Sequence, residues 1–129
     1  MTLSQTIHDV WKSNRLLCNR IPVEFLTYNF NPYERIPRAA FTIKNQNVAA
    51  RTNHGVAAEK AIVEFIILET SFAYALSDLN QIIESYDGKT FELVTNVQTV
   101  CFAVANSNVA YDNGHWKAVV NFDVSVFRY

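Results

Sequence analysis

The feature that most constrains the fold is a short apolar run that leads directly into an amphipathic segment, within residues 61–86. Residues 62–68 are almost all apolar and rich in β-branched side chains, which predicts a strand covered on both faces. The next stretch has the three-and-four spacing of a helix, with an apolar face of Phe72, Ala75, Leu76, Leu79, Ile82, Ile83 and Tyr86. Polar side chains such as Asp78 fall opposite. We therefore expect a central strand and a helix that packs on it through Phe72, Leu76, Leu79 and Ile83.

The N-terminal residues predict one amphipathic helix of about four turns, which Pro22 must stop. Thr2 and Gln5 have the spacing of a capping box. The apolar side consists of Leu3, Ile7, Val10, Trp11, Leu17 and Cys18. His8 is expected on the polar side, in contact with solvent.

The segment between this helix and the central strand contains two stretches without a regular apolar pattern. Residues 23–28 predict a short strand, and residues 29–38, with two prolines, predict an irregular loop. The loop aromatics Phe30 and Tyr33 either tuck beneath their own loop or face another protein. After a strand that begins near Phe41, residues 45–55 are polar and poor in apolar side chains. They predict a long hairpin tip or an arm that a partner orders.

The last third of the chain predicts antiparallel strands. Alternation begins at Phe91 and changes phase near residues 96–99, which indicates a bulge or a break between two strands. Asp112-Asn113-Gly114 is a turn signal, and the alternation that follows predicts a half-exposed strand. The expected fold is α+β, an antiparallel β-sheet packed by two α-helices, with residues 1–129 forming a single domain.

Charge gives no reason to expect binding to nucleic acid or to an anionic membrane. The 129 residues hold 11 basic and 12 acidic side chains, a formal net charge of -1. Eight basic and four acidic residues give residues 1–60 a balance of +4, and three and eight give residues 61–129 a balance of -5. Such a dipole favours head-to-tail association, or it reflects ordinary solvated faces. Without a signal peptide pattern or a membrane-length apolar run, a soluble intracellular product is expected.

The residue types that carry catalysis do not fall into reactive patterns. Cys18 and Cys101 match no metal or redox spacing and are expected to be buried free thiols. His8, His54 and His115 match no metal-binding motif. The residues therefore predict no enzymatic activity, no cofactor and no metal site.

Several segments together resemble the tail-terminator or tail-completion proteins of long-tailed phages, over nearly the whole chain. The points of match are the first helix ending at Arg20-Ile21, Ile36-Pro37 before the strand at 41–43, the strand 62–68, the helix 75–86 closing on a glycine, and the hairpin pattern 104–126. The chain departs from the family pattern at Glu69-Thr70-Ser71, where a basic residue is common, and at Arg38, where an aromatic residue often stands.

The resemblance implies a non-enzymatic virion structural protein without a cofactor, assembled in the host cytoplasm. It implies a homo-oligomer, a six-fold ring that caps the tail tube and meets the head connector protein at the head–tail interface. The candidate subunit or partner contacts are Phe30, Tyr33, Arg35, Arg38, Arg51 and His54. Two alternatives remain: a head-completion or connector protein of the same virion, and a small-ligand-binding α+β domain.

Overall fold

The computed structural model describes residues 3–28, 36–52, 55–94 and 98–128. Its elements are α1 (Leu3–Ser13), α2 (Arg15–Arg20), the 3-10 turn η1 (Val23–Phe25), β1 (Leu26–Tyr28), β2 (Arg38–Thr52), β3 (Gly55–Glu69), α3 (Phe72–Tyr86), β4 (Thr90–Val94), β5 (Gln98–Asp112) and β6 (His115–Arg128). The predicted α+β fold is confirmed. Within the described residues, no helix is long and apolar enough to cross a bilayer.

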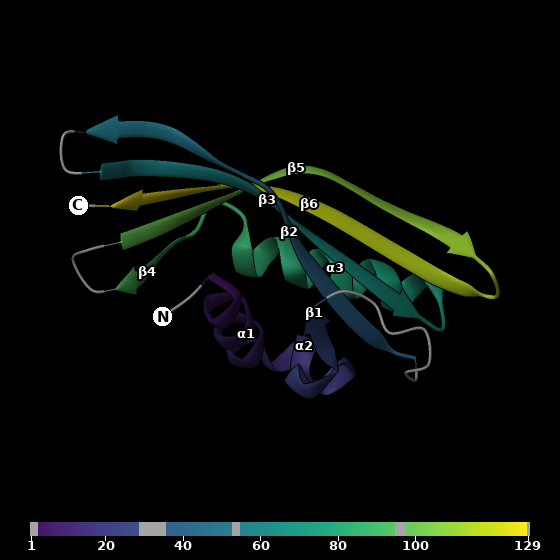
Figure 1. Ribbon diagram of the computed structural model, residues 1–129. Coiled ribbons are helices and arrows are strands. Elements are labelled where there is room, and N and C mark those ends of the chain that lie inside the picture. The colour runs from purple at the N-terminus through teal and green to yellow at the C-terminus, as the bar shows by residue number, and fades with distance from the viewer. Residues whose placement is uncertain (1–2, 29–35, 53–54, 95–97, 129) are drawn as a thin grey trace.

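The strands form one sheet in the order β1-β2-β3-β6-β5-β4. All neighbours are antiparallel except β1 and β2, which are parallel. The sheet is strongly twisted, and the three helices lie on one side of it (Figure 1). This leaves the other face of the sheet without a helical layer in the described part of the chain.

The predicted central strand is confirmed, but only one of its faces is fully covered. β3 lies between β2 and β6, and its side chains Val63, Phe65 and Ile67 are buried on the helical side. Ile62 and Ile66 alternate with them and are half-buried on the other side. The prediction that this strand is covered on both faces was therefore wrong, because the described helices all pack on the same side of the sheet.

Aromatic side chains fill the space between helices and sheet. The ring of Phe65 has its centroid 5.0 Å from that of Tyr86, 5.8 Å from that of Phe122 and 6.1 Å from that of Trp11. The Tyr86 hydroxyl donates to the backbone oxygen of Ile7, so its polar atom is satisfied inside the core. One core thus joins α1, α3 and the two central strands.

The buried stripe of α3 differs from the predicted one. Ala75, Leu79, Ile82 and Tyr86 are buried, as expected of positions one to two turns apart. Phe72 is 48% exposed and Leu76 is 39% exposed, so the predicted packing face Phe72–Leu76–Leu79–Ile83 is wrong apart from Leu79, which is buried, and Ile83, which is half-buried. Asp78, predicted on the polar side, is buried instead.

The predicted four-turn opening helix is also wrong, because the chain breaks at Asn14. Asn14 is extended (φ -93°, ψ 105°), and its side-chain oxygen accepts the N–H of Leu17 at 3.1 Å, which caps α2. His8 is half-buried and not on a solvated surface. Its ring nitrogens lie 2.9 Å and 3.0 Å from the carbonyl oxygens of Ser4 and Leu26. The two cysteines are half-buried free thiols, less covered than expected.

The hairpins agree with the turn signals. β2 and β3 extend to Thr52 and Gly55, so the described part of the polar stretch, residues 45–52 and Gly55, belongs to two long paired strands, and residues 44–51 are exposed. The phase change after Phe91 separates β4 from β5. Asn113 (φ 48°) and Gly114 (φ 87°) form the two-residue turn between β5 and β6, and this turn requires positive φ at both positions.

Candidate functional site

The start of α3 lies near the tip of the β5–β6 hairpin (Figure 1). Aromatic side chains from these elements contact one another there. The Trp116 ring packs edge-to-face against both Phe72 and Tyr111, with centroids 5.3 Å apart in each pair. Tyr111 is 62% exposed and Phe72 is 48% exposed. We call Phe72, Tyr111 and Trp116 the aromatic patch. Its members contact one another, yet much of their surface faces solvent.

Local structure fixes the patch in place. Tyr111 and Trp116 are directly opposed in the register of β5 and β6, one pair away from the Asn113-Gly114 turn. The hydroxyl of Ser71 accepts the N–H of Tyr74 at 3.2 Å and caps α3, so the helix starts at Phe72. The patch is therefore preorganised, which lowers the entropy that binding would cost.

Such a patch fits a macromolecular partner better than a small molecule. Aromatic side chains are enriched in protein interfaces and supply many of the residues that dominate their binding energy. The sequence prediction missed this surface because the helical spacing assigned Phe72 to the core. The available signal was the placement of Tyr111 and Trp116 at matched positions on either side of a two-residue turn.

A second chemically distinctive feature is a buried ionic cluster of Arg20, Glu69 and Asp78. The Arg20 guanidinium donates to both oxygens of Glu69, Nη2 to Oε1 at 2.7 Å and Nε to Oε2 at 3.3 Å. Glu69 is fully buried and Asp78 is 2% exposed. Arg20 also lies over the ring of Tyr74, 3.8 Å from its centroid. The cluster thus joins α2, the end of β3 and α3.

Asp78 differs from an ordinary carboxyl group in its pKa. Burial, then the hydrogen bond to Glu69 and its negative charge, raise the pKa of Asp78 to about 8, although Arg20 acts in the opposite direction. Asp78 is therefore mostly protonated at neutral pH, whereas Glu69 is paired with Arg20. Because both carboxyls are buried, a substrate cannot reach them. The cluster is suited to holding the helices on the sheet.

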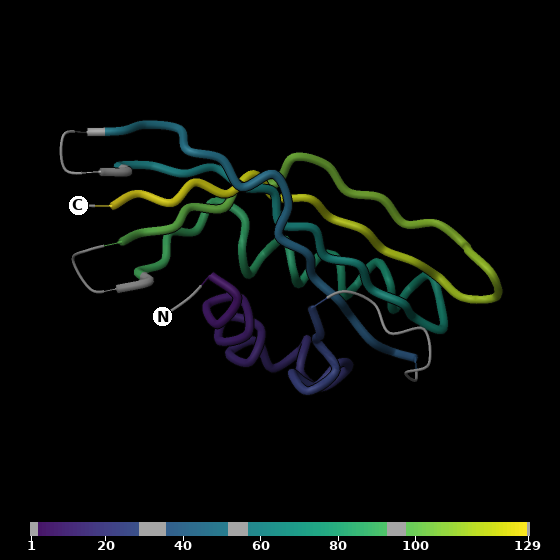
Figure 2. The backbone as a smooth tube through the Cα atoms, in the orientation of Figure 1, coloured from purple at the N-terminus to yellow at the C-terminus, as the bar shows by residue number. Residues whose placement is uncertain are grey.

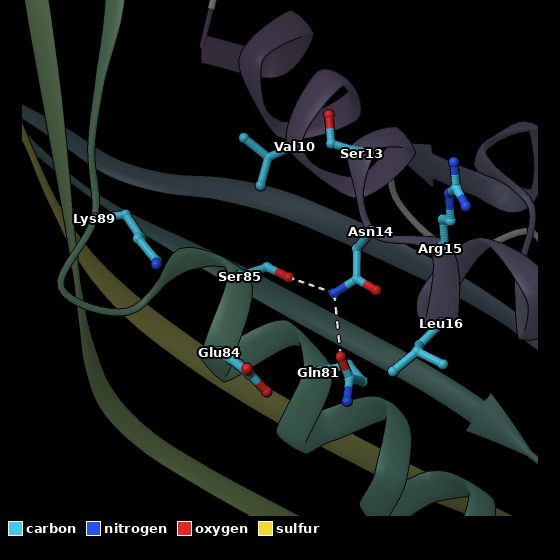
Figure 3. A pocket seen from close by; sticks show the side chains of 9 residues that line it. All are labelled: Val10, Ser13, Asn14, Arg15, Leu16, Gln81, Glu84, Ser85 and Lys89. Carbon is cyan, nitrogen blue, oxygen red and sulfur yellow. Dashed lines mark hydrogen bonds between the residues drawn. The ribbon is translucent and has the colours of Figure 1, made fainter.

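A groove runs between the α1–α2 break and α3 (Figure 3). It has a volume of about 430 Å³ and is lined by Val10, Ser13, Asn14, Arg15, Leu16, Gln81, Glu84, Ser85 and Lys89. At its centre the Asn14 amide donates to the Ser85 hydroxyl at 2.6 Å and to Gln81 Oε1 at 3.3 Å. These polar groups satisfy one another. Across the described part of the chain, no three His, Cys, Asp or Glu side chains group as a metal site.

The predicted contact residues are only partly within the described structure. Phe30, Tyr33, Arg35 and His54 lie outside the described residues. Arg38 begins β2 and is 5% exposed, whereas Arg51 is exposed near the other end of the same strand. The structure does not bring Arg38 and Arg51 together. Arg38 is therefore too buried in the subunit to serve as an exposed contact residue.

Comparison with known proteins gives a likeness in fold. No protein-family model matches the sequence, and no curated protein matches it either. The structure is similar to a chain from the "Virion of native gene transfer agent (GTA) particle", with a TM-score of 0.68 and 12% sequence identity. The match covers 97% of this chain and 94% of the other. At this identity the two chains share their fold from end to end.

Proposed function

We propose that this chain is a virion structural protein, specifically a tail-terminator subunit. In this proposal identical subunits close into a ring, a hexamer, which caps the tail tube and meets the head connector. The observation that carries it is the end-to-end fold likeness to a chain of a gene transfer agent virion, with a TM-score of 0.68 over 97% of the chain. The motif resemblance to phage tail terminators supplies the finer role.

The surface supports an assembly role. The aromatic patch combines three contacting rings, two of which are about half exposed or more. Exposed aromatic surface of this kind marks interaction sites. A small-ligand-binding role has less support, because the described space between α3 and the sheet is filled by rings such as Phe65, Tyr86 and Phe122. The proposed role requires no catalysis and no cofactor.

A head-completion or connector role would fit the same fold likeness and differs in its binding partner. The test is electron microscopy of the purified protein mixed separately with tail tubes and with portal–connector complexes. A tail terminator adds a ring at one end of the tubes. Rings found only on the portal complexes would support the head-completion alternative, and binding to neither would contradict both virion roles.

The aromatic patch predicts where the tube or a neighbouring subunit binds. The double substitution Phe72→Ala and Tyr111→Ala should weaken this association by about 2 kcal/mol, roughly thirty-fold, since interface aromatics often contribute that much. The matched control is Leu16→Ala on α2, which is also exposed (61%) but lies outside the patch. Co-sedimentation with tail tubes measures the effect. Equal binding by all three proteins would exclude the patch from the interface.

A further inference from the structure

The sheet has two open edges, at opposite sides and opposite ends (Figure 2). β1 pairs with β2 only over residues 39–41, so on the side away from β3 the rest of β2, to Thr52, has no neighbouring strand among the described residues. β4 pairs with β5 only over residues 98–101, and the backbone of Phe102 bonds to Gly88 and Lys89. We call residues 43–52 the β2 edge and residues 105–112 the β5 edge.

The β5 edge presents backbone groups that can bind another strand. In a two-residue hairpin the residues flanking the turn, here Asp112 and His115, exchange both hydrogen bonds. The alternate residues Ser107, Val109 and Tyr111 therefore direct their N–H and C=O groups away from β6. A row of outward N–H and C=O groups is a template for a further strand.

The β5 edge lacks the residues that commonly prevent an edge strand from pairing with another chain. Natural edge strands are commonly guarded by lysine, proline or bulges. Residues 105–111 contain no charged residue and no proline, and the one irregularity of β5 lies before Asn106. The β2 edge differs, because it carries Lys44 and Arg51 and has three register irregularities against β3. These features disfavour pairing of β2 with a copy of itself.

We propose that the β2 edge of one subunit pairs antiparallel with the β5 edge of the next subunit, which makes the sheet continuous around the proposed ring. This inference rests on the proposed function. Through β3 and β6, β2 and β5 run in opposite directions within a subunit, so a second copy in the same orientation offers an antiparallel neighbour. The charges agree at one end of the contact, because Lys44 of one subunit would lie diagonal to Asp112 of the next.

The positions of the two edges also fit a closed ring. Within one subunit, Thr42 pairs with Glu64, Glu64 with Asn121, and Asn121 with Asn106, so Thr42 and Asn106 lie on one line across the four strands. We infer the register that pairs the two edges from end to end, with Thr42, just before the β2 edge, opposite Asp112 of the neighbour. This register displaces the neighbour by six positions, a stagger of about 20 Å. Four strands span about 19 Å, so the strands would tilt by about 45° to the ring axis. Closed β-barrels have tilts of about 35–45°.

Single cysteines placed on the two edges test this pairing. The background is Cys18→Ala and Cys101→Ala, with either Lys44→Cys or Ala110→Cys added. In the proposed register these positions oppose each other as a non-hydrogen-bonded pair, about 4.5 Å apart between Cα atoms, within disulfide reach. Under mild oxidation the mixture of the two variants should give at least ten-fold more cross-linked dimer than either variant alone.

The controls separate the alternatives. Glu84→Cys, exposed on α3, replaces Ala110→Cys as the matched control and should not cross-link with Lys44→Cys. Cross-linking of Ala110→Cys with itself would overturn the head-to-tail contact in favour of paired β5 edges. Rings seen by electron microscopy without cross-linking of Lys44→Cys to cysteines at 108, 110 or 112 would overturn the edge pairing and leave the ring standing. A protein that never associates, even on tail tubes, would overturn the proposed ring itself.

A backbone substitution gives an independent readout. Ser107→Pro removes an outward N–H and leaves the ladder to β6 intact, because proline is tolerated at edge positions that face solvent. It should reduce ring formation at least ten-fold, whereas Ser107→Ala should assemble normally. Circular dichroism verifies folding, and analytical ultracentrifugation measures assembly. Assembly of folded Ser107→Pro at the wild-type level would overturn the inference; if that variant does not fold, the cross-linking decides.

Discussion

The burial of Asp78 beside Glu69 is the least expected feature at the scale of single residues. A second carboxyl group in a buried site is costly when ionised, and here it keeps its proton because its pKa is raised to about 8. Arg20 compensates the charge of Glu69 from a third element, α2. The proton on Asp78 and the guanidinium of Arg20 together therefore allow two carboxyl groups to be buried side by side.

The raised pKa of Asp78 predicts a loss of stability with rising pH. In the unfolded chain Asp78 titrates near its ordinary value of about 3.9, so the folded state binds more protons between there and about pH 8. The contribution of Asp78 is fully present below the unfolded pKa and is lost as pH rises through the folded pKa. Asp78→Asn should remove this contribution, so urea unfolding should show wild type losing more stability than the variant between pH 5.5 and 8.5.

The matched control for that prediction is Glu84→Gln, an exposed carboxyl on the same helix. Its pH profile should follow that of the wild type. The same pH dependence in wild type and Asp78→Asn would show that Asp78 is ionised in the folded protein throughout this range.

Because of the Arg20–Glu69 pair, Arg20→Ala and Arg20→Lys should lower the free energy of unfolding by different amounts. Arg20→Ala leaves the fully buried Glu69 without its guanidinium, and loss of one partner of a buried pair costs about 3–5 kcal/mol. The lower end, about 3 kcal/mol, is expected because the Arg20 side chain is 34% exposed to water. Arg20→Lys keeps the charge and should lose less, although it cannot reproduce the two-point contact. Denaturant melts in which both variants match wild type would contradict the assigned role.

At the scale of elements, α3 predicts two different outcomes for two similar leucines. Leu79 is 4% exposed in the core, and Leu79→Ala should cost about 2–5 kcal/mol of unfolding free energy. Leu76, one turn earlier, is 39% exposed, and Leu76→Ala should cost about 0.5 kcal/mol or less. Urea melts of the two variants measure the difference. Equal losses would mean that the helix is rotated relative to the sheet.

The sequence predicted the existence and kind of most elements but not the rotation of α3. Phe72 and Leu76 have the same helical spacing as core residues, so periodicity alone could not exclude them from the buried face. Their exposure depends on how the twisted sheet meets the helix, which is a tertiary property. The burial of Asp78 is also a tertiary property, since Arg20, which lies near it, is 58 positions away in sequence. The break at Asn14 had a local signal, an asparagine able to cap α2.

For the molecule as a whole, the turn residues predicted more of the strand pairing than the amino-acid composition did. Asn113-Gly114 fixed the β5–β6 register, which in turn places Tyr111 opposite Trp116. The sheet order β1-β2-β3-β6-β5-β4 could not be predicted, because it depends on which distant strands meet. The order matters for the proposed edge pairing, since it places the basic β2 edge and the uncharged stretch of β5 on opposite sides of the sheet.

Electron microscopy of tail tubes after addition of the purified protein, with particle masses recorded in parallel, tests whether the protein is a tail terminator. We expect a closed ring of identical subunits seated on one end of the tube, with a mass near six subunits of 14.7 kDa. Ring formation should fail when assembly variants such as Ser107→Pro replace the wild type. Tube ends that stay bare, with the protein monomeric at every concentration, would show that it is not a tail terminator.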